Sequence, residues 1–281
     1  MADGSYRWQG HSPAPDAARV EAIHAAWDEA GAADFAEPAR AAAVERIEAA
    51  LAAARSGDLA GAGARLAQAR SMLESLNPAA LEPRRGLAGL FDGRGKRLKA
   101  FREAFRRASA ALSDAAADLT GQVEAAAARS GALDAVWTGV RDAMVELDAH
   151  LLAAARRLSG HTPAEDAPPH PLEARKAALD ACRAAALGAL PLIRGAQNAD
   201  ARAAEALRAC GDGMAEWRQG WTEALGLAAK RPKRVRPDRE RLLALRDALL
   251  ARIDRALAEL TASRGRRADI EGRLSDLRAP L

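Results

Sequence analysis

Apolar side chains recur along most of this chain at alternating steps of three and four residues, with small and polar residues between them. In the central region the pattern begins near Lys96 and includes Phe101, Phe105, Leu112 and Leu119. This spacing aligns the apolar side chains in one stripe along a helix, as in the heptads of coiled coils. It predicts a long helix that packs against others along that stripe.

The stripes predict further long elements after this helix. Ser130–Gly131 is predicted to form a tight turn, so that the first two long helices fold back as an antiparallel hairpin. The next element runs from Leu172 to about Ala196 and contains Pro191, which should kink or break it. Two more helices follow. The apolar positions of the second, fourth and last helices are Leu133, Val136, Val140, Met144, Leu147, Leu151 and Leu158, then Leu207, Cys210, Met214, Trp217, Trp221 and Leu225, then Leu242, Leu245, Leu249, Ile253, Leu260, Ile270, Leu274 and Leu277.

Shorter helical patterns precede the long ones. One should start near Pro15–Asp16 and end at Gly31, with Trp27 on its apolar face, and Pro38 can open the first turn of the next. We therefore expect a disordered N-terminus over residues 1–14 and a small N-terminal helical region over 15–82. A long-helix bundle should occupy residues 83–281, with loops at 160–171 and 228–237.

The composition supports an all-α fold. Alanine, leucine, arginine and glutamate dominate, and only 4% of the residues are aromatic. Helix-favouring residues are thus abundant, whereas the β-branched and aromatic residues that strands prefer are scarce. Alanine buries little area per residue at roughly 25 cal/mol per Å². We therefore expect an elongated bundle of long antiparallel, coiled-coil-like helices, stabilised along extended seams.

Positive charge is concentrated in two segments. The formal net charge of the chain is +4, but Arg84–Arg107 holds nine basic and two acidic residues, and Lys230–Arg241 holds seven basic and two acidic residues. The rest of the chain is acidic, so these segments are candidates for contact with an anionic surface, the alternative being an ordinary solvated face. The candidate residues for anionic-surface binding are Arg84, Arg85, Arg94, Lys96, Arg97, Lys99, Lys230, Arg231, Lys233, Arg234 and Arg236.

No motif indicates catalysis, a cofactor or a metal. Gly95-Lys96 fails as a phosphate-binding loop, because Leu90 stands where its first glycine is needed and Arg97 where Ser or Thr is needed. The five histidines form no HExxH motif. Cys182 and Cys210 are far apart and fall on apolar stripes, so we interpret them as core residues. The sequence therefore predicts a protein that is not an enzyme and has no small-molecule substrate.

Two aromatic or apolar groups are candidates for docking a partner. Leu90 and Phe91 lie beside dense basic residues, which is typical of an interfacial membrane anchor. Trp217 and Trp221 are four residues apart on one helix face. Burial in a local core is the alternative for both groups.

Three segments resemble the TelA-like toxic-anion (tellurite) resistance family. They are GLAGLFDGRGKRLKAFREAF (Gly86–Phe105), the stretch Leu190–Leu227 with Pro191, Ile193, Gln197, Asn198 and Trp217, and the charged last helix at Ser263–Leu277. The similarity covers about residues 66–281. The chain departs from the family where the short basic linker Lys230–Pro237 replaces a further helical stretch. The resemblance implies a cytoplasmic helical protein of a stress-resistance system, and it supplies no reaction.

The leading hypothesis is a non-enzymatic scaffold that binds protein partners of a toxic-anion or envelope-stress resistance system, with peripheral docking at the inner membrane face. The alternative is a helical protein that binds nucleic acid or anionic lipid through residues 84–107 and 230–241, although no interleaved aromatics favour nucleic acid. A narrower idea is oxyanion capture at the helix start Gly93–Lys96, where Asp92 would compete. The amino terminus lacks an apolar signal core, no stretch reaches the roughly 18–20 apolar residues of a membrane span, and we expect a cytoplasmic protein. The heptad stripes leave open whether they pair within one chain or between chains.

Overall fold

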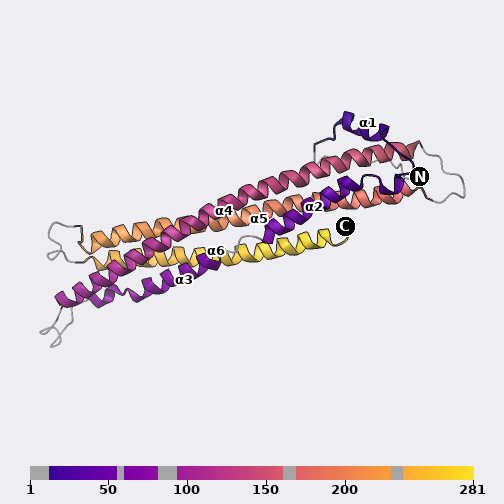
Figure 1. Ribbon diagram of the computed structural model, residues 1–281. Coiled ribbons are helices and arrows are strands. Elements are labelled where there is room, and N and C mark those ends of the chain that lie inside the picture. Colours follow the sequence, from indigo (N-terminus) through magenta and orange to yellow (C-terminus); the bar gives the residue numbers. More distant parts are fainter. Residues whose placement is uncertain (1–12, 56–59, 82–93, 161–168, 229–236) are drawn as a thin grey trace. The chain divides into compact units, whose positions relative to one another are not determined.

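The computed structural model describes residues 13–55, 60–81, 94–160, 169–228 and 237–281 (Figure 1). Of these residues 89% are helical and none lies in a strand, which confirms the predicted all-α fold. The helices are α1 (Ala17–Ala25), α2 (Glu37–Arg55), α3 (Ala60–Ser75), α4 (Arg94–Ser159), α5 (Pro171–Ala224) and α6 (Arg239–Arg278), with 3₁₀ turns at Ala32–Asp34 and Pro78–Leu81. Most of the predicted disordered N-terminus lies outside the described residues, as do residues 83–93 of the predicted long-helix bundle and most of its predicted loops at 160–171 and 228–237.

The chain divides into two compact units. Unit 1 comprises Met1–Ser56, Arg129–Asn198 and Arg266–Leu281, and unit 2 comprises Gly57–Ala128 and Ala199–Gly265. Each unit therefore takes one segment from each of α4, α5 and α6. Helices α1 and α2 complete unit 1, and α3 completes unit 2.

The core of unit 2 is formed by the predicted stripes. Phe101 and Phe105 of α4 and the apolar face of α5 are buried together with residues of α3 and α6. The ring of Phe101 stacks on Trp221 with centroids 5.8 Å apart, and Phe105 lies 5.4 Å from Trp217. Phe101 precedes Phe105 on α4, whereas its partner Trp221 follows Trp217 on α5. These segments of the two helices are therefore antiparallel.

The core of unit 1 combines apolar residues of α2, α4, α5 and α6 with one buried ion pair. Arg183 Nε donates to Asp148 Oδ1 at 2.5 Å, and both side chains are almost fully buried. Removing one partner of such a pair would strand a buried charge, which costs about 3–5 kcal/mol. The pair therefore favours a single register between α4 and α5.

Helix α4 continues through Ser130–Gly131, so the predicted tight turn there is wrong. The reason is packing: Leu119, Ala126, Leu133 and Val140 follow one another at steps of seven, and all four are buried. A glycine within a helix costs only about 1 kcal/mol relative to alanine. That local cost is smaller than the loss of a buried leucine or valine on either side would be.

Helix α5 likewise continues through Pro191, so the predicted break there is wrong and the predicted third and fourth elements are one helix. Proline within a helix costs about 3 kcal/mol or more, because it removes a hydrogen bond and clashes with the preceding turn. Pro191 is exposed, whereas Leu190, Leu192 and Ile193 beside it are buried. The proline thus occupies the outer face while its neighbours fix the inner face in the core.

The helix ends follow local rules with one exception. Asp16 caps α1 by accepting from the N–H of Ala18 at 3.0 Å, and α5 ends where Gly226 adopts a φ of 66°. There the N–H of Leu227 donates to the Thr222 carbonyl at 2.9 Å, as in a Schellman motif. The exception is α1, which ends at Ala25 rather than at Gly31. Trp27 therefore lies beyond the helix, where its ring packs on Phe35.

Glycines on α5 accommodate side chains of α6 in both units. A Cβ added at Gly188 or Gly195 would lie 3.2 Å from Leu277 or Ile270, and one added at Gly213 would lie 2.7 Å from Arg252 Cδ. At Gly220 an added Cβ would overlap Leu245. By contrast, nothing lies within 4 Å of a Cβ added at Gly131 of α4.

We predict that replacing a glycine in open space and replacing a glycine packed against α6 have opposite effects on stability. Gly131→Ala should raise the free energy of unfolding by about 1 kcal/mol, because it improves helix propensity in open space. Gly220→Leu should lower it by about 1–3 kcal/mol, because the new side chain overfills the contact with α6. Urea unfolding followed by circular dichroism measures both.

Gly211→Ala is the matched control on α5, since nothing lies within 4 Å of its added Cβ. It should raise the free energy of unfolding by about as much as Gly131→Ala does. A loss of stability in Gly131→Ala would contradict the continuity of α4.

Candidate functional site

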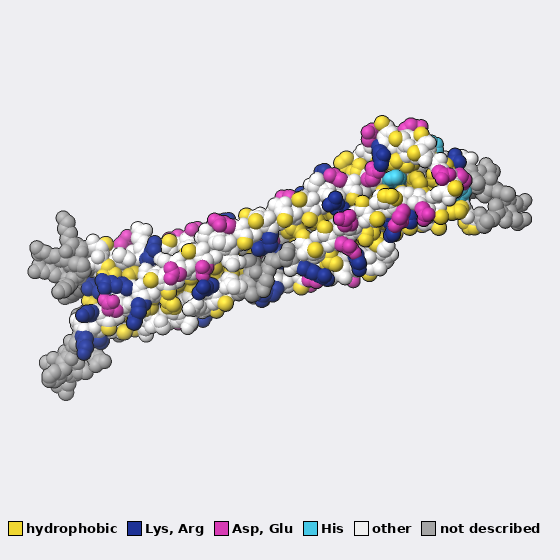
Figure 2. Space-filling view, viewed as in Figure 1, with side chains coloured by type: hydrophobic (Ala, Val, Ile, Leu, Met, Phe, Trp, Pro, Cys, Tyr) yellow, Lys and Arg dark blue, Asp and Glu magenta, His cyan; other side chains and the backbone are white. Residues whose placement is uncertain are grey.

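Basic side chains gather at the end of unit 2 where α4 begins. Lys96 and Lys99 are exposed, and Arg97 and Arg102 are half-buried. The first turn of α4 contains no acidic residue. Figure 2 shows Lys and Arg side chains in dark blue at this end. Because a helix start carries a partial positive charge, the basic side chains add to an already positive site.

The structure brings the described parts of the two basic segments together. Arg102 Nη2 donates to the Leu225 carbonyl at 2.7 Å, which fixes the start of α4 to the end of α5. The N–H of Asp238 donates to the Ala224 carbonyl at 3.0 Å, and Arg241 pairs with Glu223. The starts of α4 and α6 thus both contact the end of α5. Burial, followed by the charge of Arg106, lowers the pKa of Arg102.

Arg97, Lys96 and Lys99 are the predicted anionic-surface residues whose side chains the structure describes. Arg97 Nη1 donates to the Ala80 carbonyl at 3.0 Å, whereas Lys96 and Lys99 form no ion pair within the described part of the chain. The other predicted residues lie outside the described side chains: Arg84, Arg85, Leu90, Phe91, Arg94, Lys230, Arg231, Lys233, Arg234 and Arg236.

Trp217 and Trp221 are core residues, so the hypothesis that they form a partner-docking surface is wrong. Their exposed fractions are 1% and 0%. Their rings lie 4.8 Å apart, in a cluster with Phe101 and Phe105. The reason is that the i, i+4 pair falls on the stripe that α5 turns toward α4 and α6. Trp221 Nε1 donates to the Leu242 carbonyl at 3.0 Å, whereas the buried Trp217 Nε1 has no hydrogen-bond partner among the described residues.

The cysteines and His170, which the sequence does not indicate as catalytic or metal-binding residues, lie in a core or in a polar contact within the chain. Cys182 and Cys210 are buried, as predicted, and burial raises the pKa of Cys210 to about 11. A thiol with a raised pKa is a poor nucleophile. His170 Nε2 lies 2.7 Å from Glu29 Oε1. Among the described residues, no three His, Cys, Asp or Glu side chains are placed to hold a metal ion.

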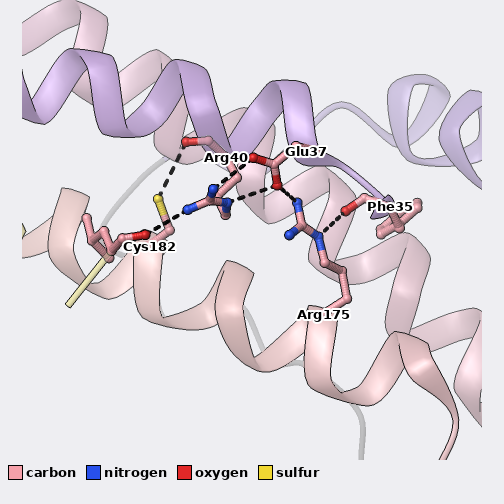
Figure 3. A network of polar contacts seen from close by, with 6 residues as sticks. Phe35, Glu37, Arg40, Arg175 and Cys182 are labelled. Atoms are coloured by element: carbon pink, nitrogen blue, oxygen red, sulfur yellow. Dashed lines mark hydrogen bonds and ion pairs between the residues drawn. The ribbon is translucent and has the colours of Figure 1, made fainter. Parts of the chain in front are cut away.

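A polar cluster around Glu37 in unit 1 escaped the sequence analysis. Glu37 accepts from Arg40 Nε at 3.0 Å and from Arg175, while Arg175 Nε also donates to the Phe35 carbonyl at 2.6 Å (Figure 3). Arg40 Nη1 donates to the Leu281 carbonyl at 2.8 Å. Hydrogen bonds from Arg40 and then Arg175 lower the pKa of Glu37 to about 2. The cluster ties the start of α2 to α5 and to Leu281, three residues beyond the end of α6, and it therefore stabilises unit 1.

Of the contacts in this cluster, the sequence could predict only the one between Glu37 and Arg40. Glu37 and Arg40 stand three residues apart, a spacing at which side chains meet on a helix. The contacts with Arg175 and Leu281 join residues far apart in the chain, and no local pattern predicts them.

The comparisons with known proteins leave the family open. No protein family, no curated protein and no solved structure matches the chain. Within the described residues, no helix is both long enough and apolar enough to cross a bilayer.

We predict that Trp221→Phe destabilises the protein more than Trp217→Phe, by about 1–3 kcal/mol. Both substitutions remove the same atoms. Trp221→Phe deletes the hydrogen bond to the Leu242 carbonyl, whereas Trp217→Phe deletes a buried N–H that forms no hydrogen bond with the described residues. Guanidinium unfolding of the two variants measures the difference. Equal losses would show that the two N–H groups have equivalent environments.

We also predict that Glu37 makes stability depend on acid pH. Folding lowers its pKa from 4.5 to about 2, so its contribution is complete above pH 4.5 and is lost as the pH falls toward 2. Glu37→Gln should lower the urea midpoint at pH 7 and reduce its fall between pH 4.5 and pH 2.

Glu45→Gln, at an exposed position of α2, is the control and should leave both quantities near those of the original protein. A Glu37→Gln variant with an unchanged midpoint at pH 7 would show that the cluster contributes no stability.

Proposed function

We propose that the chain is a non-enzymatic helical binding protein that docks on an anionic membrane surface through the end of unit 2 where α4 and α6 begin. One observation carries the proposal: the exposed Lys96 and Lys99 lie in the first turns of a 66-residue helix whose first turn contains no acidic residue. Basic side chains there oppose the helix dipole by about 0.3–1 kcal/mol each. Contact with an anionic surface would offset that cost.

The start of α6 provides an internal contrast. There Asp238 accepts from the N–H of Arg241 at 3.1 Å, and Glu240 lies in the first turn. Residues of the chain itself thus supply a hydrogen-bond acceptor and negative charge at the start of α6. The excess of positive charge is therefore greater at α4, and we assign α4 the larger part of the contact.

The cellular setting of the proposal rests on the resemblance to the TelA-like family. It is a toxic-anion (tellurite-type) or envelope-stress resistance system, in which the protein would act as a scaffold for protein partners at the inner membrane face. Such a role needs exposed binding surfaces rather than a reactive centre.

Nucleic acid is the second candidate for the same charges. Proteins that hold single strands usually stack bases on exposed aromatic rings. At this end of unit 2, the rings of Phe101, Phe105, Trp217 and Trp221 are all buried. The described residues therefore favour lipid headgroups over bases.

The full chain should sediment with vesicles that contain phosphatidylserine and remain unbound with vesicles of phosphatidylcholine alone. Lys96→Ala/Lys99→Ala should weaken binding about thirtyfold, since each of the two basic residues near such a surface contributes about 1 kcal/mol. Raising the salt should weaken the binding of the unaltered chain. In cells, the variant should fail to restore the tellurite tolerance of a strain that lacks the gene.

Arg208→Ala/Arg273→Ala is the matched control, because it removes the same charge from exposed positions of α5 and α6. It should bind as the unaltered protein does. Equal losses of vesicle binding in the two double variants would show that binding depends only on net charge. Preferential binding to duplex DNA would favour the nucleic-acid candidate.

A further inference from the structure

An open groove runs between α5 and α6 in unit 2. Its volume is about 920 Å³. Alanines make up much of its lining, and charged side chains stand along both edges. The lining residues are Arg202, Glu205, Ala206, Ala209, Asp212, Glu216, Arg252, Arg255, Ala256, Ala258, Glu259 and Ala262.

Opposite charges face each other over part of the groove, where Asp212 and Glu216 lie on α5 and Arg252 and Arg255 lie on α6, whereas Arg202 on α5 and Glu259 on α6 lie further along. Glu216 of α5 pairs with Arg252 of α6 at 2.8 Å. One turn further, Asp212 is exposed and forms no ion pair in the described structure. Opposite it, Arg255 is exposed, and its Nε donates to the Ala251 carbonyl of its own helix at 3.2 Å. The carboxylate of Asp212 on α5 and the guanidinium of Arg255 on α6 are therefore available to a binding partner.

We propose that this groove is an interface between two copies of the chain, with α5 of each copy beside α6 of the other. Around a twofold axis parallel to the helices, α5 remains antiparallel to its partner's α6, as it is to its own. Residues that lie level across the groove then also lie level between the copies. Asp212 of each copy would meet Arg255 of the other, twice by symmetry.

The alanines of the groove make a second copy a good fit. Ala209, Ala258 and Ala262 are exposed, and small side chains let helices approach at the short end of the usual 8–10 Å range. The edges supply specificity, because complementary charges set register and like charges repel. A second copy supplies both edges at once.

The chain's own short helix in unit 2 does not cover the groove. Helix α3 pairs with α4 through Arg65 and Asp118, at 2.8 Å. It pairs with α6 through Arg70 and Asp254, also at 2.8 Å. Neither pair involves α5 or a residue that lines the groove.

Charge reversal tests the proposal without disturbing a buried residue. In Asp212→Arg, and separately in Arg255→Glu, both symmetric contacts of a homodimer become repulsive. In an equimolar mixture of the two variants, each mixed dimer regains two attractive contacts. Sedimentation velocity on the full chain between about 1 and 200 µM should show dimer for the original protein, at least about tenfold weaker association for each variant, and recovery in the mixture.

Asp114→Arg and Arg208→Glu make the same charge changes at exposed positions outside the groove, and both should dimerise normally. Circular dichroism establishes that every variant is folded. A monomeric original protein would overturn the proposal, as would a dimer that survives both reversals or a mixture that fails to recover. Because the readout is self-association alone, such a result would leave the proposed membrane contact standing.

Discussion

The close approach of α5 and α6 is the constraint on which both units depend. Gly188 and Gly195 are seven residues apart, as are Gly213 and Gly220, and each lies under a side chain of α6. Seven residues is almost two helical turns, so the four positions mark one face of α5. A protein rich in alanine and glycine buries little area per residue. It gains stability instead from many short-range contacts, and these require two long helices to stay in register.

The apolar stripes were predictable because helical periodicity is a local property. Phe101, Phe105, Leu207 and Met214 are buried as their spacing predicts. The continuity of α4 through Gly131 and of α5 through Pro191 was not predictable, because the costs of these residues are local while the contacts that outweigh them are distant in sequence. Leu133 and Ile193, for example, belong to the same core cluster although 60 positions separate them. A single sequence shows the penalty at such a position but not the compensating contact.

The candidate site divides in a similar way. The exposure of Lys96 and Lys99 follows from dense charge on one segment. The burial of Trp217 and Trp221 could not be decided from sequence, because an aromatic pair four residues apart suits a core and a docking surface equally well. The cluster around Glu37 was missed because Arg175 reaches it from another helix. Periodicity shows which residues share a face, but not which face meets which.

These exceptions to local rules help to separate structure from function. Gly131 and Pro191 break helix rules at positions whose neighbours are buried, and packing within the chain compensates for each. The basic first turn of α4 also breaks a rule, since cations disfavour a helix start. Within the described residues, Lys96 and Lys99 have no carboxylate partner and remain exposed. Sequences that fold well are consistent at every level except where binding or catalysis requires otherwise. An exception compensated from within explains folding, whereas the uncompensated positive charge at the start of α4 is the basis of the proposed contact with an anionic membrane.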